Sequence, residues 1–252
     1  MDPLHAAALA GAGLVAGALN TLAGGGSLLL VPALMLLGGG MPATEANASS
    51  RVAIFAQCLA GATTFARGGV TPVQAAVRVV PPVLVGALLG AWLATELPNR
   101  IFEPLLLGTL AVMAIGMLVN PARFAPAPGT EPREVRGVLA YAGLFAAGVY
   151  GGVLQAGAGL VFLGILAGGL RFDLVRANAL KALVMLVYIA ATVAVFAAAG
   201  MVHWEPAAFM SIGSVIGAWG AARMAMSARG VMITKVVVVC AVIGMGVAIA
   251  LR

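Results

Sequence analysis

The stretch NTLAGGGSLLLVP, residues 20–32, interrupts an apolar run that is otherwise long enough to form a membrane helix. Each of its three successive glycines costs a helix about 1 kcal/mol relative to alanine. A segment that only had to cross a membrane as a helix would gain nothing from them. We therefore expect a break in this helix at residues 24–26, at membrane depth.

The composition of the chain is that of a helical membrane protein. Of its 252 residues, 62% are hydrophobic and only 9% are charged, whereas soluble domains carry about 25% charged residues. Apolar runs of about 20 residues, the length of a membrane-spanning helix, recur along the chain. The sequence thus predicts an all-α polytopic membrane protein. Its net charge of +6 then reflects cytoplasmic loops rather than nucleic-acid binding.

The chain also contains an internal repeat at an offset of about 131 residues. Three pairs of segments match: 16–32 with 147–164, 44–54 with 175–185, and 86–92 with 213–219. Chance could supply any one of these matches, but several in the same order indicate a duplicated unit. We expect each half to contain one broken segment followed by three full membrane spans.

The predicted boundaries follow from the apolar runs. The first repeat, 1–119, is expected to hold a broken segment at 6–37 and spans at 44–66, 79–95 and 101–119. A Pro-rich, charged linker at 120–136 follows. The second repeat, 137–252, is expected to hold a broken segment at 137–168 and spans at 174–199, 206–222 and 230–251.

The basic residues indicate how the broken segments lie in the membrane, because Lys and Arg near span ends favour the cytoplasm. Arg51 and Lys181 are set aside because they fall within spans. If each broken segment crosses once, six basic residues lie on either side. If each is a re-entrant hairpin, ten lie on one side and only Arg100 and Arg252 on the other. We therefore predict re-entrant hairpins, two inverted repeats with three transmembrane helices each, a cytoplasmic linker and both termini outside.

The glycine break itself suggests a site for a negative charge. Backbone at membrane depth leaves helical geometry only where protein or a water-filled site surrounds it, and glycine allows a ligand to approach closely. Ser27 is expected to cap the returning half-helix, whose free N–H groups carry partial positive charge. The alternative is that the glycines only permit close helix packing.

A polar stripe follows each break. In the first half it consists of Asn47, Ser50, Arg51 and Gln57, and at an offset of 131 the second half supplies Asn178, Lys181 and Tyr188. A charge inside the membrane costs about 2.5–3.5 kcal/mol on insertion scales, so two cations in related spans indicate a functional site. The alternative for each cation is snorkelling to the interface. All eight acidic residues fall at span ends or in loops, which leaves an anionic substrate to neutralise the cations.

We predict that thirteen residues border one substrate-binding cavity on the axis between the halves: Asn20, Gly25, Gly26, Ser27, Asn47, Ser50, Arg51, Gln57, Gln155, Gly157, Asn178, Lys181 and Tyr188. The sequence carries no zinc-ligand spacing and no nucleophile–base signature. We therefore expect no catalytic residue, metal or cofactor. Cys58 and Cys240 are isolated in apolar segments and are interpreted as buried small hydrophobes.

Four segments resemble the TauE/SafE family of membrane transporters, known as sulfite exporters: NTLAGGGSLLLVPALMLLG (20–38), ANASSRVAI (46–54), GVLQAGAGLVF (152–162) and RANALKALVM (176–185). The resemblance covers essentially the whole chain. It implies a bacterial inner-membrane transporter of small sulfur-containing anions such as sulfite, sulfonates, sulfoacetate or thiosulfate. In the second half QAGAG (155–159) replaces GGGS, which leaves open whether both breaks contact substrate equally.

The expected direction of transport follows from the membrane voltage. An anion leaving through an inside-negative membrane gains about 2.3 kcal/mol per charge per 100 mV, so export is favoured and needs no coupled ion. Two alternatives stay open: a non-transporting membrane scaffold or assembly protein, and a transporter of another small organic anion. The expected partners are the anion and the lipid bilayer, without nucleic acid, and the sequence does not decide between a monomer and a homo-oligomer.

Overall fold

The computed structural model describes residues 1–119, 126–127 and 129–226. Within these residues the regular elements are helices: α1 (Pro3–Ala23), α2 (Ser27–Leu37), α3 (Ala43–Arg67), α4 (Val73–Glu96), α5 (Asn99–Val119), α6 (Val138–Val153), α7 (Ala158–Leu163), a π-helical segment (Gly164–Gly169), α8 (Leu174–Ala198) and α9 (Trp204–Ala225). The all-α prediction is confirmed. The predicted span 230–251 and Cys240 lie outside the described residues.

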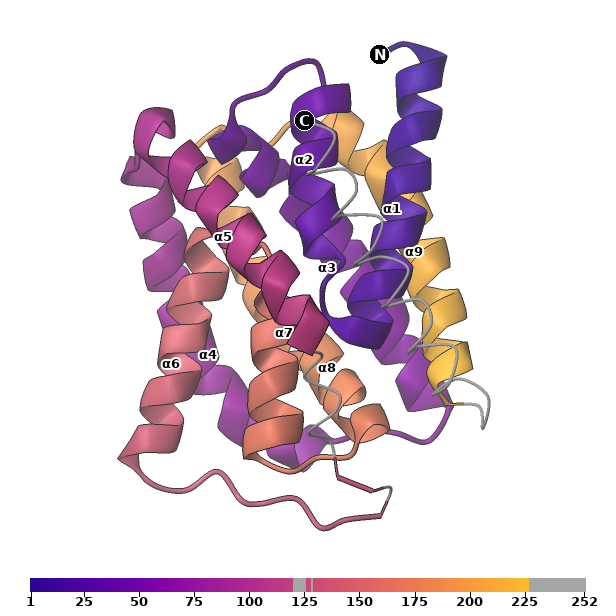
Figure 1. Cartoon of the computed structure of the whole chain (residues 1–252), viewed down its shortest axis with the longest axis vertical. Coiled ribbons are helices and arrows are strands. Elements are labelled where there is room, and N and C mark those ends of the chain that lie inside the picture. The colour runs from indigo at the N-terminus through magenta and orange to yellow at the C-terminus, as the bar shows by residue number, and fades with distance from the viewer. Residues whose placement is uncertain (120–125, 128, 227–252) are drawn as a thin grey trace.

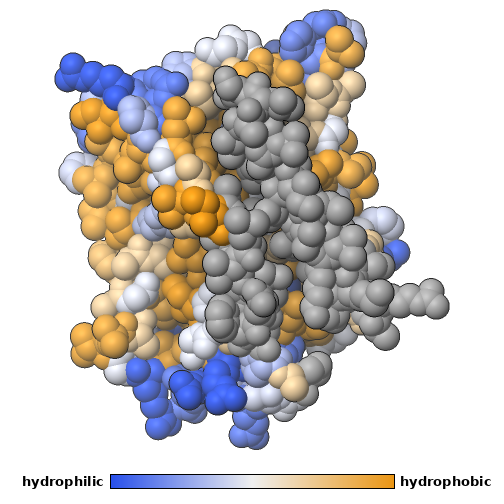
Figure 2. All heavy atoms as spheres, viewed as in Figure 1, coloured by the Kyte–Doolittle hydropathy of each residue, from blue (hydrophilic) through white to orange (hydrophobic). Residues whose placement is uncertain are grey.

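The helices and their surface have the character of a membrane protein. Among the described helices, α1, α4 and α8 are long and apolar enough to cross a membrane. α3 has 25 residues, but its polar face is buried against other helices and so does not have to be apolar. In Figure 2, the coloured part of the visible face is mainly apolar between its upper and lower ends, where hydrophilic side chains gather.

The chain reverses direction at both breaks, from opposite ends of the molecule (Figure 1). α1 descends from the N-terminus, and α2 returns upward; α6 climbs from the lower end, and α7 with the π-helical segment returns downward. The first reversal begins at Gly24, whose φ of +81° ends α1. The second contains Gly157 at φ +73°. Glycine adopts such left-handed angles without steric cost, which is why the reversals form there.

α1 packs closely against α9 because glycines face backbone at their contact. Gly13 and Gly17 of α1 lie against the carbonyl oxygens of Met210 and Ser214, respectively, where an added Cβ would come within 2.1 and 2.3 Å. From α9, Gly217 lies in the same way against the Leu14 carbonyl oxygen, at 2.0 Å. Small residues four apart allow membrane helices to approach closely.

α4 and α6 form a second close pair by the same means. Gly86 and Gly90 of α4 would place a Cβ 2.2 Å from backbone oxygens of α6. Gly148 and Gly152 of α6 would each place one 2.3 Å from backbone oxygens of α4. For these glycines the packing interpretation is therefore sufficient.

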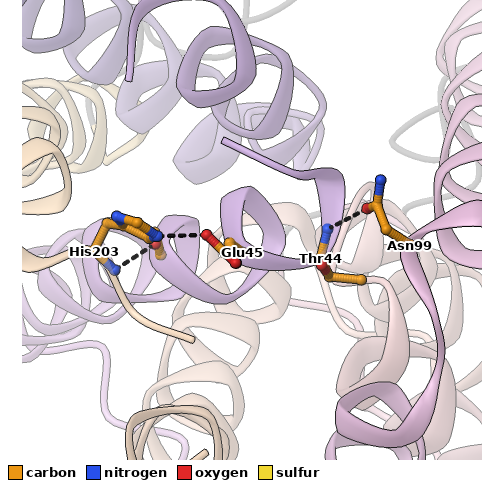
Figure 3. Close-up of polar contacts among 5 residues, drawn as sticks. Thr44, Glu45, Asn99 and His203 are labelled. Atoms are coloured by element: carbon orange, nitrogen blue, oxygen red, sulfur yellow. Dashed lines mark hydrogen bonds and ion pairs between the residues drawn. The ribbon is translucent and has the colours of Figure 1, made fainter. Parts of the chain in front are cut away.

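α3 and α8 contact each other between these two pairs, and α3 also packs against α9 while α8 packs against α4. The first turns of α3 are tied to neighbouring segments (Figure 3). His203, which precedes α9, contacts Glu45 through its ring, and the Thr44 backbone N–H donates to Asn99 Oδ1 at 3.2 Å. These contacts fix the end of the helix that carries Asn47, Arg51 and Gln57.

Candidate functional site

All thirteen residues of the predicted site are buried in the structure. They lie in two polar clusters, one around Lys181 and one around Arg51, and at the two breaks, which contact each other. Each cluster joins a long helix of one half to the end of a broken segment of the other.

The Lys181 cluster lies at the C-terminal end of α1. The Lys181 ammonium donates to the Asn20 carbonyl oxygen at 2.6 Å, to Asn178 Oδ1 at 2.8 Å and to the Thr21 carbonyl oxygen at 3.5 Å. The last carbonyls of a helix lack partners within it and carry partial negative charge. The ammonium therefore caps the half-helix before the first break.

The Arg51 cluster lies at the C-terminal end of α6. The Arg51 guanidinium donates to the carbonyl oxygens of Gly152 at 2.6 Å, Gly151 at 3.0 Å and Val153 at 3.4 Å. Its planar fork reaches several carbonyls at once, which an ammonium does less well. It caps the half-helix before the second break.

Side chains of α8 and the second break complete the Arg51 cluster. The guanidinium also donates to Thr192 Oγ1 at 3.2 Å and to Gln155 Oε1 at 3.4 Å, and it lies 4.6 Å from the centre of the Phe196 ring. The Tyr188 hydroxyl donates to the same Gln155 oxygen at 3.1 Å. Gln155 is thus held from two sides, at a φ of +56° that is rare for a residue with a side chain.

Two asparagines make matching contacts in the two clusters. Asn47 Nδ2 donates to the Val153 carbonyl oxygen at 3.0 Å, and Asn178 Nδ2 donates to the Leu22 carbonyl oxygen at 3.5 Å. Both the donors and the acceptors are separated by the repeat offset of 131 residues. Ser50 stays within its own helix and donates to the Asn47 carbonyl oxygen at 2.8 Å.

Neither cation snorkels to the surface. Arg51 is 0% exposed and Lys181 is 2% exposed, and their partners in the structure are backbone and side-chain oxygens together with one aromatic ring. Among the described acidic residues only Asp173 is buried, and it caps the N-terminus of α8 by accepting from the Arg176 backbone N–H. The two buried cations therefore have neutral partners.

The two breaks contact each other directly. The Gly157 backbone N–H donates to Ser27 Oγ at 2.9 Å, so Ser27 does not cap its own helix as we expected; Gly26 occupies the N-cap position. Gly24 and Gly159 touch through their backbones, since a Cβ on Gly24 would lie 2.4 Å from the Gly159 carbonyl carbon. The other glycines of the predicted site, Gly25 and Gly26, are buried in the same region.

A small cavity of about 10 Å³, room for about one water molecule, adjoins the Lys181 cluster. It is lined by Asn20, Thr21, Gln57, Cys58, Gly61, Asn178, Lys181 and Ala182. Four of these eight belong to the predicted site. Gln57 is 1% exposed, and neither its Nε2 nor its Oε1 has a hydrogen-bond partner in the structure.

Several residues of these clusters are not evident from the sequence. The carbonyls of Thr21, Gly151 and Gly152 act through backbone, which residue type does not reveal. Phe196 had a signal, because it matches Phe65 at the repeat offset. The sequence signal for Cys58 and Gly61 was weaker: these residues lie one and four positions after Gln57, on the same helix.

The chain is similar to known membrane transporter proteins. The family model for the sulfite exporter TauE/SafE matches residues 9–249. A probable membrane transporter protein of Haemophilus influenzae is 28% identical over 230 residues, covering 90% of this chain and 88% of that protein. A probable membrane transporter protein, ORF9, of a Sinorhizobium species is 26% identical over 239 residues, covering 94% and 88%. No solved structure matches. The chain belongs to the TauE/SafE family of membrane transporters.

Proposed function

We propose that this protein transports small sulfur-containing anions, of the sulfite, sulfonate, sulfoacetate or thiosulfate class, across a bacterial inner membrane, with export as the favoured direction. The observation that carries the proposal is the pair of buried cations, Arg51 and Lys181, whose partners are neutral. A buried charge without a counter-charge is costly. An anion that binds between the helices and then leaves would supply the missing charge for part of the transport cycle.

We further propose that the fold consists of two inverted repeats, each with a re-entrant hairpin, and that both termini face outward. The matching asparagine contacts at one offset support the duplication. The opposite directions of the two reversals in Figure 1 support the inversion. Transporters built this way bind substrate where broken helices meet near the middle of the membrane.

The thirteen residues of the predicted site are proposed to form the substrate pathway. The two capped half-helix ends and the Ser27–Gly157 contact between the breaks support this placement. In the described structure these groups are packed together, so transport requires them to separate. Alternating access through such a site commonly involves one bundle of helices rocking against the other.

Flux measurements on the purified full-length chain in liposomes test the proposal. We expect sulfite to move electrogenically, at a rate that follows the membrane voltage and not an imposed proton gradient, because an anion leaving a negative interior needs no coupled ion. The Arg51→Ala, Lys181→Ala double variant should lose this flux. The Arg67→Ala, Arg100→Ala double variant, which removes two exposed cations, should keep it.

Other results would favour other functions. Flux that stops without a proton or sodium gradient would contradict uncoupled export. A sulfite flux that persists unchanged in the Arg51→Ala, Lys181→Ala variant would remove the role of the buried cations. Efficient exchange of acetate, with sulfite and sulfoacetate excluded, would favour another organic anion. No flux of any anion would favour a membrane scaffold.

A further inference from the structure

We infer that the two clusters have different roles: the cavity beside Lys181 binds the transported anion through Lys181 and Gln57, whereas the Arg51 cluster holds the second break in a fixed shape. This inference rests on the proposed function and adds to it the location of the binding site. It is carried by the cavity beside Lys181, by the unpaired amide of Gln57 on its wall, and by the larger side chains at the matching positions of the Arg51 cluster.

Two of the residues that line the cavity carry polar atoms without a hydrogen-bond partner in the described structure. Gln57, at 1% exposure, leaves both ends of its side-chain amide unpaired, and Asn20, at 3% exposure, leaves its Oδ1 unpaired. Unpaired polar groups are rare in protein interiors, where each one is unfavourable. Since a side-chain amide can turn over, Gln57 can present its NH₂ group to a ligand in the cavity.

Lys181 also has bonding capacity to spare on this side. Two of its hydrogen bonds are short, at 2.6 and 2.8 Å, but the third, to the Thr21 carbonyl oxygen, is 3.5 Å long. An oxyanion oxygen could replace this weak third acceptor and gain a charge-assisted hydrogen bond. An ammonium and an amide NH₂ group on one small cavity suit a compact anion with several oxygens.

The Arg51 cluster also leaves three buried polar atoms unpaired, Asn47 Oδ1, Arg51 Nε and Gln155 Nε2, but larger side chains occupy the positions that match Gln57 and Gly61. At the repeat offset Tyr188 corresponds to Gln57, and Thr192 corresponds to Gly61. The Tyr188 hydroxyl is bonded to Gln155, and the Thr192 hydroxyl is bonded to Arg51 and to the Ile189 carbonyl oxygen. These contacts hold the second cluster in place, while a cavity adjoins the first.

The cavity as it stands is smaller than the proposed ligand. Its volume of about 10 Å³ holds about one water molecule, and sulfite is a larger group of one sulfur and three oxygen atoms. Binding therefore requires α3 and α8 to move apart. Small residues face each other there: a Cβ on Gly61 would lie 3.9 Å from the Cβ of Ala182.

The Gly61→Ala variant tests the inference by filling this space. Its added methyl group would meet Ala182 and the Thr21 hydroxyl at 3.9 and 4.0 Å, which is ordinary contact, so the fold is kept. Gly220→Ala is the matched control, because it also adds a methyl group to a helix and has nothing within 4 Å. Gln57→Leu removes the amide while keeping a side chain of similar size.

The measurement is the rise in unfolding temperature that sodium sulfite causes in the purified full-length chain, compared with sodium chloride at equal ionic strength, since a ligand of the folded state stabilises it. We expect sulfite to stabilise the wild type and Gly220→Ala equally. Gln57→Leu should weaken the apparent affinity about tenfold or more, as loss of a hydrogen bond to a charged group does. Gly61→Ala should show no rise in unfolding temperature with sulfite. Its unfolding temperature in chloride should be no lower than that of the wild type, which shows that the fold is intact.

The outcomes separate this inference from the proposed function. Sulfite stabilisation and liposome flux that are unchanged in both Gly61→Ala and Gln57→Leu would overturn the cavity as the binding site and leave sulfur-anion transport standing. A wild type that shows neither stabilisation nor flux would overturn the proposed function, and this inference with it.

Discussion

The backbone N–H of Gly157 donates a hydrogen bond to the hydroxyl oxygen of Ser27, across 2.9 Å. The two residues are 130 positions apart in the chain, and each lies at a helix break. The bond therefore joins the two breaks, next to the backbone contact of Gly24 with Gly159. A change in one break is expected to reach the other through these contacts.

Removing the Ser27 hydroxyl should destabilise the fold. In Ser27→Ala the Gly157 N–H stays buried without its acceptor, and an unpaired buried donor costs about 1–3 kcal/mol. We expect a lower unfolding temperature in detergent. Ser211→Ala is the control, because that hydroxyl donates to a carbonyl of its own helix and is only partly buried. Equal unfolding temperatures for the two variants would show that the Ser27–Gly157 bond contributes little.

Adding a methyl group to Gly26 should prevent normal packing of the first break. The Cβ of Gly26→Ala would lie 1.8 Å from the Ala16 carbonyl oxygen and 2.7 Å from the Asn20 backbone N, both on α1. Such overpacking costs about 1–3 kcal/mol or more. We expect a low yield of monodisperse protein by gel filtration. Gly11→Ala is the control, because Gly11 is also on α1 but has nothing within 4 Å of an added Cβ; this variant should elute as the wild type does. If both variants elute like the wild type, Gly26 is not closely packed against α1.

Replacing Arg51 by lysine should weaken the structure although the charge is kept. An ammonium cannot reproduce the forked contacts with the carbonyls of Gly151 and Gly152. A hydrogen bond to a charged group contributes about 1.5–3 kcal/mol, so we expect Arg51→Lys to lose about 2 kcal/mol of unfolding free energy. Arg67→Lys, at the exposed end of the same helix, should lose almost none. If Arg51→Lys has the same unfolding free energy as the wild type, only the charge at this position contributes to stability.

Thiol labelling in intact cells tests the proposed topology. With Cys58 and Cys240 replaced by serine, a cysteine at position 3 should react with an impermeant maleimide, and a cysteine at position 129 should react only after the cells are opened. This follows from the ten-to-two distribution of basic residues. Labelling of position 129 from outside, with position 3 protected, would reverse the orientation.

Much of the helical framework could be predicted from the apolar runs, since bilayer thickness sets the length of a membrane helix. The helix ends do not follow from hydropathy alone: α4 begins at Val73, before the predicted span 79–95, because its first turns carry polar residues, including Arg78, that a hydropathy pattern excludes. The break at Gly24–Gly26 was also readable, since three adjacent glycines strongly disfavour a continuous helix.

The hydrogen-bond partners of the site residues could not be predicted from the sequence. The sequence indicates that Arg51 and Lys181 are paired across the repeat, but their acceptors are largely backbone carbonyls, which every residue possesses. Gln155 adopts a left-handed angle that its residue type does not favour. The difference between the clusters depends on how much space Gly61 and Thr192 leave, which only the packing of α3 against α8 reveals.

The capping contacts have a consequence for how the protein is made. The carbonyls at the end of α1 are capped by Lys181 and Asn178, and those at the end of α6 by Arg51 and Asn47. During synthesis, the carbonyls at the end of α1 therefore lack these partners until residues about 160 positions later have left the ribosome. Either half inserted alone keeps unpaired carbonyls at its break, so the two halves reach a stable structure only as one cooperative unit.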